Sequence, residues 1–434
     1  MTGLHTIARQ SLRTLGMSVV QVLLGLITSV IVARALGPQE RGIYALFVLI
    51  ATGLATLLNP GIYAAANYFV GTGQLTPAAG YRATLDLAAL TAVLGAAAAI
   101  PAAWVLGLPT PAGFAAALAA LTLAQIVINS FNGLFYGAGR VATITRWKIV
   151  WAALVCLAFV LAAVGGTDAL ACAWLFAMLN AIDAIAVIVL FRRSITVEQP
   201  PTGSARAMLR YGIPVYASRA LLFLGQRLDG YLVFLLAGAA ALGQYGIAVT
   251  LAEQIWLLPT SVGLIMMATI GKLDTQAAAG ATMRVIRTAT ALIIPAAIVL
   301  LICIPLLVPL LYGAPYTAAG FAFLLLLPGT ALVGLCNLAE PFFQSRGRPD
   351  IPLLTCAAGL GLNLTGNLLL IPQHGMLGAA VAASVAYSIQ AAITLVLFVR
   401  MGEVRWRELL GLDYAYRAIG CAVIAWVATM RRVS

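Results

Sequence analysis

Long runs of apolar residues follow one another along almost the whole chain, separated by short segments that contain glycine, proline or charge. Most of these runs reach the roughly 20 residues that an α-helix needs to cross the hydrocarbon core of a bilayer. They lack the alternation of apolar and polar residues that is typical of the strands of a transmembrane barrel. The pattern therefore predicts an all-α integral membrane protein.

The apolar runs fall into two sets of six. The first set predicts membrane-spanning helices over residues 17–36, 42–70, 81–107, 112–136, 145–165 and 168–191. The second set predicts helices over residues 211–237, 243–271, 285–312, 319–343, 351–372 and 375–400. A further run at 418–430 is only marginally long enough to span, so we expect an amphipathic or partial thirteenth element there. The fold class we expect is thus about twelve transmembrane helices.

The longest polar stretch, residues 192–210, has the proline, glycine, serine and charge content of a linker. It divides the chain into an N-terminal lobe, residues 1–191, and a C-terminal lobe, residues 211–400. Residues 401–434 follow as a charged segment with the partial helix. Because the linker is expected on the cytoplasmic side, both lobes enter the membrane from the same side.

A short motif recurs at equivalent places in the two lobes. The spacing of glycine, four residues, glycine, one residue and tyrosine occurs at Gly37 to Tyr44 and again, 201 positions later, at Gly238 to Tyr245. Two copies in equivalent positions indicate duplicated halves. Since each half holds an even number of helices, we expect the lobes to be related by a pseudo-two-fold axis along the membrane normal.

Composition and charge exclude other classes of protein. With 62% hydrophobic and 9% charged residues, the chain departs far from a soluble domain. The net charge of +12 follows from topology: if the N-terminus is cytoplasmic, the outer loops before residue 401 hold only Arg34 and Arg41. We therefore expect a multi-pass protein of a bacterial inner membrane with a cytoplasmic N-terminus, and no nucleic-acid partner.

Motifs for catalysis are nearly absent. The chain has two histidines, and it contains no H-E-x-x-H, no G-x-S-x-G and no Walker loop. Its six cysteines lie in apolar runs without the spacing of metal ligands. We therefore expect no enzyme, no catalytic residue, no metal and no cofactor. A membrane glycan polymerase or ligase, the enzymatic alternative, would need a large outer loop, which the pattern does not contain.

Ionisable residues inside the predicted helices are the strongest functional signal, because each is costly at mid-bilayer. The helix at 211–237 carries Arg219, Gln226, Arg227 and Asp229. Arg219 and Gln226 share a face, and Arg227 lies one step round from it, about 12 Å further along the axis. A guanidinium fork fits phosphate oxygens, so these residues are candidates to bind an anionic substrate. Structural salt bridges with Asp229 and Glu253 are the alternative.

Five further positions are candidates for gating, ion coupling or substrate contact. Asp229 and Glu253 can form ion pairs or couple to a cation. Pro60 and Pro259 fall at nearly equivalent repeat positions, where proline frees a backbone carbonyl and bends the helix. Arg34 precedes the outer break between the first two helices. Amides such as Asn129 and Asn132 serve mainly as bonds between helices, but together they suggest a hydrated cavity.

Three segments resemble one family of transporters. Residues 33–46 (ARALGPQERGIYAL), residues 229–259 and residues 371–380 (IPQHGMLGAA) are similar to the polysaccharide flippases of the multidrug/oligosaccharidyl-lipid/polysaccharide transporter superfamily. The resemblance implies two six-helix lobes around a cavity that opens alternately to each side. It also implies that a polyprenyl-pyrophosphate-linked oligosaccharide is moved to the outer leaflet for surface polysaccharide assembly, with its lipid tail in the bilayer through a gap between the lobes.

The resemblance leaves the substrate open. Membrane lipids and polysaccharide assembly proteins are the partners that a flippase would have. A cation-coupled multidrug antiporter of the same superfamily is the alternative function, and it would confer drug resistance without changing a surface glycan.

Overall fold

A computed structural model describes residues 2–108, 110–195, 204–256, 259, 270 and 273–404, with the side chains of 2–15, 18 and 218 left out. Within these ranges every regular element is helical. Nine helices in the same ranges are long and apolar enough to cross a membrane. The chain forms two compact units, Met1–Phe234 with Gly238–Gly243 and Leu235–Ala237 with Gln244–Ser434.

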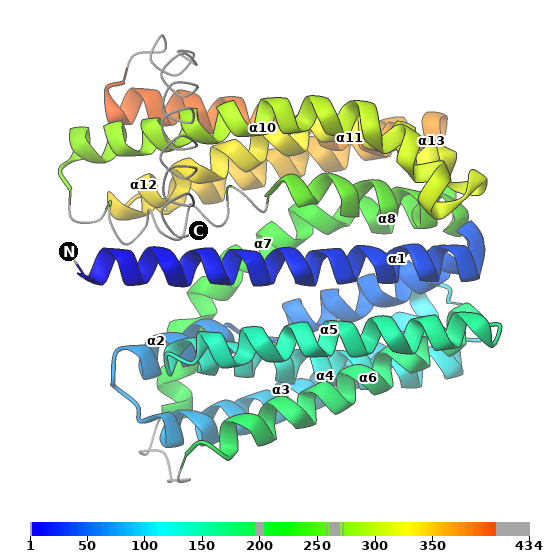
Figure 1. Cartoon of the computed structure of the whole chain (residues 1–434), viewed down its shortest axis with the longest axis horizontal. Helices are drawn as coiled ribbons and strands as arrows, with labels where there is room; N and C mark the ends of the chain where they lie inside the picture. The colour runs from blue at the N-terminus through cyan, green and yellow to red at the C-terminus, as the bar shows by residue number, and fades with distance from the viewer. Residues whose placement is uncertain are drawn as a thin grey trace, which may run out of the picture. The chain divides into compact units, whose positions relative to one another are not determined.

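The first unit is built around one central helix, α4. Its helices are α1 (Thr2–Leu57), α2 (Ile62–Gly71), α3 (Pro77–Val105), α4 (Pro111–Gly137), α5 (Val141–Val164), α6 (Ala169–Arg192) and most of α7 (Ser204–Ala237). Helix α4 packs against α1, α2, α3 and α6, while α5 lies along α1 (Figure 1).

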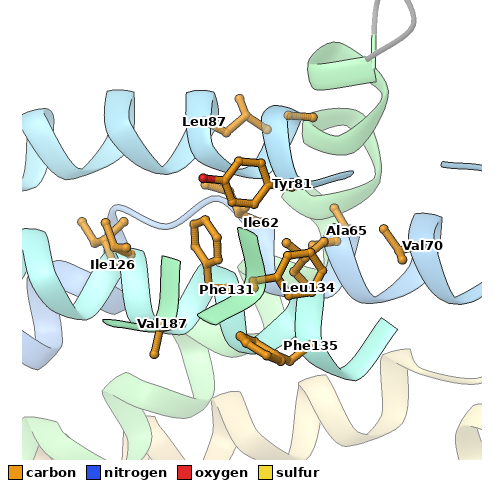
Figure 2. Packing of buried hydrophobic residues seen from close by; sticks show 14 of the residues in the cluster. Ile62, Ala65, Val70, Tyr81, Leu87, Ile126, Phe131, Leu134, Phe135 and Val187 are labelled. Carbon is orange, nitrogen blue, oxygen red and sulfur yellow. The ribbon is translucent and has the colours of Figure 1, made fainter. Parts of the chain in front are cut away.

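Aromatic rings fill the core where α2, α3, α4 and α6 meet, as Figure 2 shows. The ring of Tyr81 meets that of Phe131 edge-on at 5.7 Å. Phe135 and Phe191 meet in the same way at 5.0 Å. Edge-to-face pairs of this kind stabilise a core beyond the area they bury. They fix α4 between its neighbours.

The helix predicted over residues 42–70 is interrupted. Helix α1 ends at Leu57 and α2 begins at Ile62, so residues 58–61 form a break and not only the bend that Pro60 suggested. Proline has no N–H for the helix ladder, and Gly61 takes a left-handed conformation with φ 72° that other residues avoid. Asn59 Oδ1 then accepts a hydrogen bond from the Ile62 amide at 3.2 Å and restarts the helix.

The first glycine of the repeated motif has a positive φ in both copies. Gly37 kinks α1 with φ 69°, and Gly238 has φ 88° at the start of α8 (Ala239–Glu253). The two copies touch reciprocally: a Cβ on Gly42 would lie 1.7 Å from the Ala239 carbonyl oxygen, and one on Gly243 would lie 2.2 Å from that of Pro38. Since Ala239 is the repeat equivalent of Pro38, the contact is symmetric. Larger side chains would exclude it.

The second unit contains the remaining helices. After α8 come η1 (Gln254–Trp256), α10 (Thr275–Tyr312), η2 (Ala314–Tyr316), α11 (Thr317–Cys336), η3 (Asn337–Ala339), α12 (Glu340–Ser345) and α13 (Asp350–Gly402). Helix α11 packs against α10 and α13 (Figure 1). Helix α13 joins the two predicted helices at 351–372 and 375–400 through a kink at Gly375, which has φ 56°.

The predicted linker is shorter than its composition suggested. Helix α6 ends at Arg192 and α7 begins at Ser204, so residues 204–210 are helical. Residues 196–203 and the predicted partial helix at 418–430 lie outside the described residues. The count of twelve helices, the lobe boundaries and the pseudo-two-fold axis stay predictions.

Candidate functional site

A cavity of about 300 Å³ lies in the first unit. Its walls come from the end of α1, the 58–61 break, α2, α4, α5 and the first half of α7. None of the described residues that line it is acidic. Two cations, three tyrosines, three asparagines and one threonine are its polar lining residues.

Close backbone contact places α7 beside this cavity. A Cβ on Gly61 would lie 2.2 Å from the Gly212 carbonyl oxygen, and one on Gly212 would lie 2.5 Å from that of Pro60. The Tyr216 hydroxyl donates a hydrogen bond to the Leu57 carbonyl. These contacts hold α7 against the 58–61 break, which brings Arg219 to the cavity wall.

Two positive charges flank a pair of tyrosine rings. The Arg219 guanidinium carbon lies 5.0 Å from the centroid of the Tyr63 ring. Tyr63 and Tyr136 meet edge-on with their centroids 6.0 Å apart. The Lys148 Nζ lies 5.8 Å from the Tyr136 centroid. Cation–π attraction orders both cations, and the two rings carry no charge that would neutralise them.

Three amides add hydrogen-bonding groups to the same cavity: Asn59, Asn129 and Asn132. The Asn59 Nδ2 donates to Ser130 Oγ at 3.1 Å, so this amide is fixed to α4. Asn132 is only 8% exposed, and its Oδ1 has no hydrogen-bond partner among the described residues. A buried acceptor without a partner costs free energy, which a ligand hydroxyl or N–H at this point would recover.

The structure brings one predicted substrate contact, Arg219, to the cavity. Gln226 and Arg227 lie about two turns further along α7, are partly buried and do not line it. Arg34 is exposed on α1, just before the kink at Gly37. The roles assigned to all four stay predictions.

The predicted gating residues lie in different places. Asp229 is buried in α7, and its Oδ1 accepts the Gly230 amide at 2.8 Å. Glu253 is the last residue of α8, in the second unit. Pro60 lies in the 58–61 break beside the cavity. Pro259 is buried and helical, but its neighbours on both sides lie outside the described residues.

Sequence reasoning missed Lys148 and the tyrosine pair. Lys148 lies about two turns into α5, and the sequence pattern assigned it no role. One signal was available, because Lys148 is one of two lysines in a chain that otherwise uses arginine. No signal in the sequence marked Tyr63 or Tyr136, since the ring contacts arise from packing.

Comparison with known proteins identifies the family. Residues 7–270 match the family model described as "Polysaccharide biosynthesis protein". No curated protein matches the chain significantly.

Several solved structures share the fold. A multidrug resistance MATE family transporter of the MOP superfamily, inward-facing, is 14% identical with a TM-score of 0.69, over 88% of this chain and 95% of that chain. A MOP superfamily transporter from Pyrococcus furiosus is 15% identical with a TM-score of 0.66, over 91% and 94%. Lipid II flippase MurJ, inward closed, is 13% identical with a TM-score of 0.61, over 93% and 92%.

These similarities confirm the predicted all-α integral membrane fold, and the similar proteins are transporters and flippases, not enzymes. The family model covers more than half of the chain. The chain therefore belongs to the polysaccharide biosynthesis protein family and is a multi-pass membrane protein with the fold of MOP superfamily transporters.

Proposed function

We propose that this protein is a flippase that moves a polyprenyl-pyrophosphate-linked oligosaccharide from the cytoplasmic to the outer leaflet by alternating access. The observation that carries the proposal is the pair of cations, Arg219 and Lys148, in a cavity without acidic lining residues. A pyrophosphate presents several anionic oxygens, and guanidinium and ammonium groups both bind phosphate well.

The size and polarity of the cavity support the same substrate class. Its volume of about 300 Å³ is at the small end for ligand sites. It can hold the charged group and the sugar beside it, but not a whole oligosaccharide. The amides Asn59, Asn129 and Asn132 offer donors and acceptors for sugar hydroxyls.

The proposed setting is a bacterial inner membrane, with the N-terminus in the cytoplasm and polysaccharide assembly proteins as partners. Charge favours a flippase over the multidrug antiporter. Two cations in the cavity would repel a cationic drug, and no described lining residue is a carboxylate that would attract one.

The test compares Lys148→Ala, Arg219→Ala and the double variant with the parent protein in cells that lack the native gene. Surface polysaccharide and membrane abundance are measured together. Each single change removes one charge-assisted contact worth about 1.5–3 kcal/mol, so we expect roughly a tenfold loss of export or more, and no export in the double variant. Arg82→Ala, an exposed arginine of α3 outside the cavity, is the matched control.

Full export by the double variant at normal abundance would refute the assignment. Drug resistance on expression, with unchanged surface polysaccharide, would establish the antiporter in its place.

A further inference from the structure

A second cavity of about 390 Å³ lies in the first unit, between α1, α4, α5 and α6. Lys148 lines this cavity as well as the polar one. The two cavities thus share one lining residue, Lys148.

The walls of the second cavity are mainly apolar. Trp151, Val155 and Phe176 lie on them together with Ala152. Trp151 also stacks on Trp147, with the ring centroids 5.6 Å apart. This surface suits a hydrocarbon chain, because aromatic and branched side chains gain most by removing apolar area from water.

Two of the polar groups on these walls already have partners in the protein. The Thr28 hydroxyl donates to the Leu24 carbonyl at 2.9 Å. The Asp183 carboxylate accepts the Trp147 indole N–H at 2.7 Å and attracts Lys148 electrostatically. Both groups are therefore already engaged by the protein.

Exposed apolar side chains lie on other faces of α1 and α5, away from the cavity. Leu23 and Ile27 of α1 are 52% and 50% exposed, and Leu154 and Leu157 of α5 are 44% and 55% exposed. In a membrane protein such a surface faces lipid. The helices that form the walls of the cavity are therefore in contact with the bilayer.

We propose that the second cavity binds the first isoprene units of the polyprenyl chain, with Lys148 at the pyrophosphate that joins chain and sugar. In the substrate the charged group lies between an apolar chain and a polar sugar. The protein presents the same order: the apolar cavity, Lys148, and the cavity with the asparagines. The inference rests on the proposed function. It places the start of the tail within the first unit, whereas the family resemblance implied a gap between the lobes.

Binding to the purified full-length protein tests this. The probes are farnesyl pyrophosphate and inorganic pyrophosphate, measured by calorimetry. We expect farnesyl pyrophosphate to bind about tenfold more tightly or better, since its chain buries apolar area. Gly25→Leu should fill the second cavity and reduce the affinity for farnesyl pyrophosphate to that of pyrophosphate, with pyrophosphate binding unchanged. Lys148→Ala should weaken both.

The matched control is Gly16→Leu, an exposed glycine of the same helix outside the cavity. A Cβ at Gly16 or Gly25 meets no atom within 4 Å, so the first carbon of a new side chain fits at both positions. If Gly25→Leu does not yield folded protein, Val155→Trp replaces it. Its control is Leu154→Trp, the exposed neighbour on α5.

The outcomes separate the two proposals. If the parent protein binds neither probe, the proposed function fails, and this inference fails with it. If pyrophosphate binds but farnesyl pyrophosphate binds no more tightly, the tail site alone is refuted. The same holds if Gly25→Leu and Gly16→Leu behave alike.

Discussion

At the scale of single residues, the cavity combines a charged residue that the sequence identifies with aromatic residues that it does not. Arg219 stands out as an arginine within an apolar helix. Nothing in the sequence distinguishes Tyr63 from other tyrosines. Packing places its ring centroid 5.0 Å from the Arg219 guanidinium carbon. Its ring orders the arginine, whereas its hydroxyl is not needed for the attraction.

The ring of Tyr63 should therefore matter more than its hydroxyl. We expect Tyr63→Ala to weaken pyrophosphate binding by about 2- to 30-fold, the range that a cation–π contact of about 0.5–2 kcal/mol gives. Tyr63→Phe keeps the ring and should bind within about twofold of the parent. Calorimetry on both variants measures this, and equal losses in both would show that the hydroxyl is the important group.

We expect Asn132→Ala to lower the affinity for substrate without lowering the stability of the ligand-free protein. The buried Oδ1 of Asn132 has no partner among the described residues, so the empty protein bears the cost of desolvating it. Asn132→Ala removes that cost, and the melting temperature without ligand should stay the same or rise. Affinity for a sugar-bearing substrate should fall about five- to tenfold, the value of one hydrogen bond. A large fall in melting temperature would indicate a structural amide instead.

At the scale of elements, the charged break between the first two predicted helices is mainly structural. Glu40 accepts the Ala169 amide at the start of α6 at 3.0 Å, and Arg41 donates to Ser29 Oγ at 3.1 Å. The two copies of the glycine motif meet at Gly42 and Gly243. The sequence predicted that the copies are equivalent. Their mutual contact depends on backbone approach, which no residue pattern specifies.

Gly42→Ala and Gly243→Ala should each push this contact apart. Overpacking of this kind costs about 1–3 kcal/mol, so we expect the melting temperature of the purified protein to fall by several degrees. Because both changes act on one contact, the double variant should lose less than the sum. Gly246→Ala is the control, since a Cβ there meets no atom within 4 Å. An equal effect from Gly246→Ala would argue against a specific contact.

At the scale of the whole molecule, composition and contacts divide the chain differently. The polar stretch at 192–210 suggests a lobe boundary before α7. The compact units instead divide between residues 235 and 243. Most of helix α7 belongs with the first unit, because Gly212, Tyr216 and Tyr231 contact the backbone of residues 49–61. The Tyr231 hydroxyl, for example, donates to the Leu49 carbonyl at 2.8 Å.

The topology is testable by labelling single cysteines in a cysteine-free background. If the N-terminus is cytoplasmic, Thr110→Cys between α3 and α4 lies outside, and Arg193→Cys after α6 lies inside. Both positions are exposed. An impermeant maleimide should label Thr110→Cys in intact spheroplasts, and Arg193→Cys only after permeabilisation. The reverse pattern would invert the proposed direction of transport.

The sequence by itself determined that the chain forms helices and that these helices lie in a membrane. A spanning helix satisfies its backbone hydrogen bonds within one segment, so a local apolar run is enough to specify it. Arginine placement added the expected topology, and Arg219 was identifiable because a charge inside such a run is costly.

Only the tertiary structure decided the cavities. Helices that are apolar on all sides do not show which face meets lipid and which meets another helix. Asn59, Lys148 and Arg219 are far apart in the sequence and come together where Gly61 and Gly212 allow two backbones to touch. The site depends on that packing. Whether two helices approach closely depends on both of them, so the sequence of one helix does not determine it.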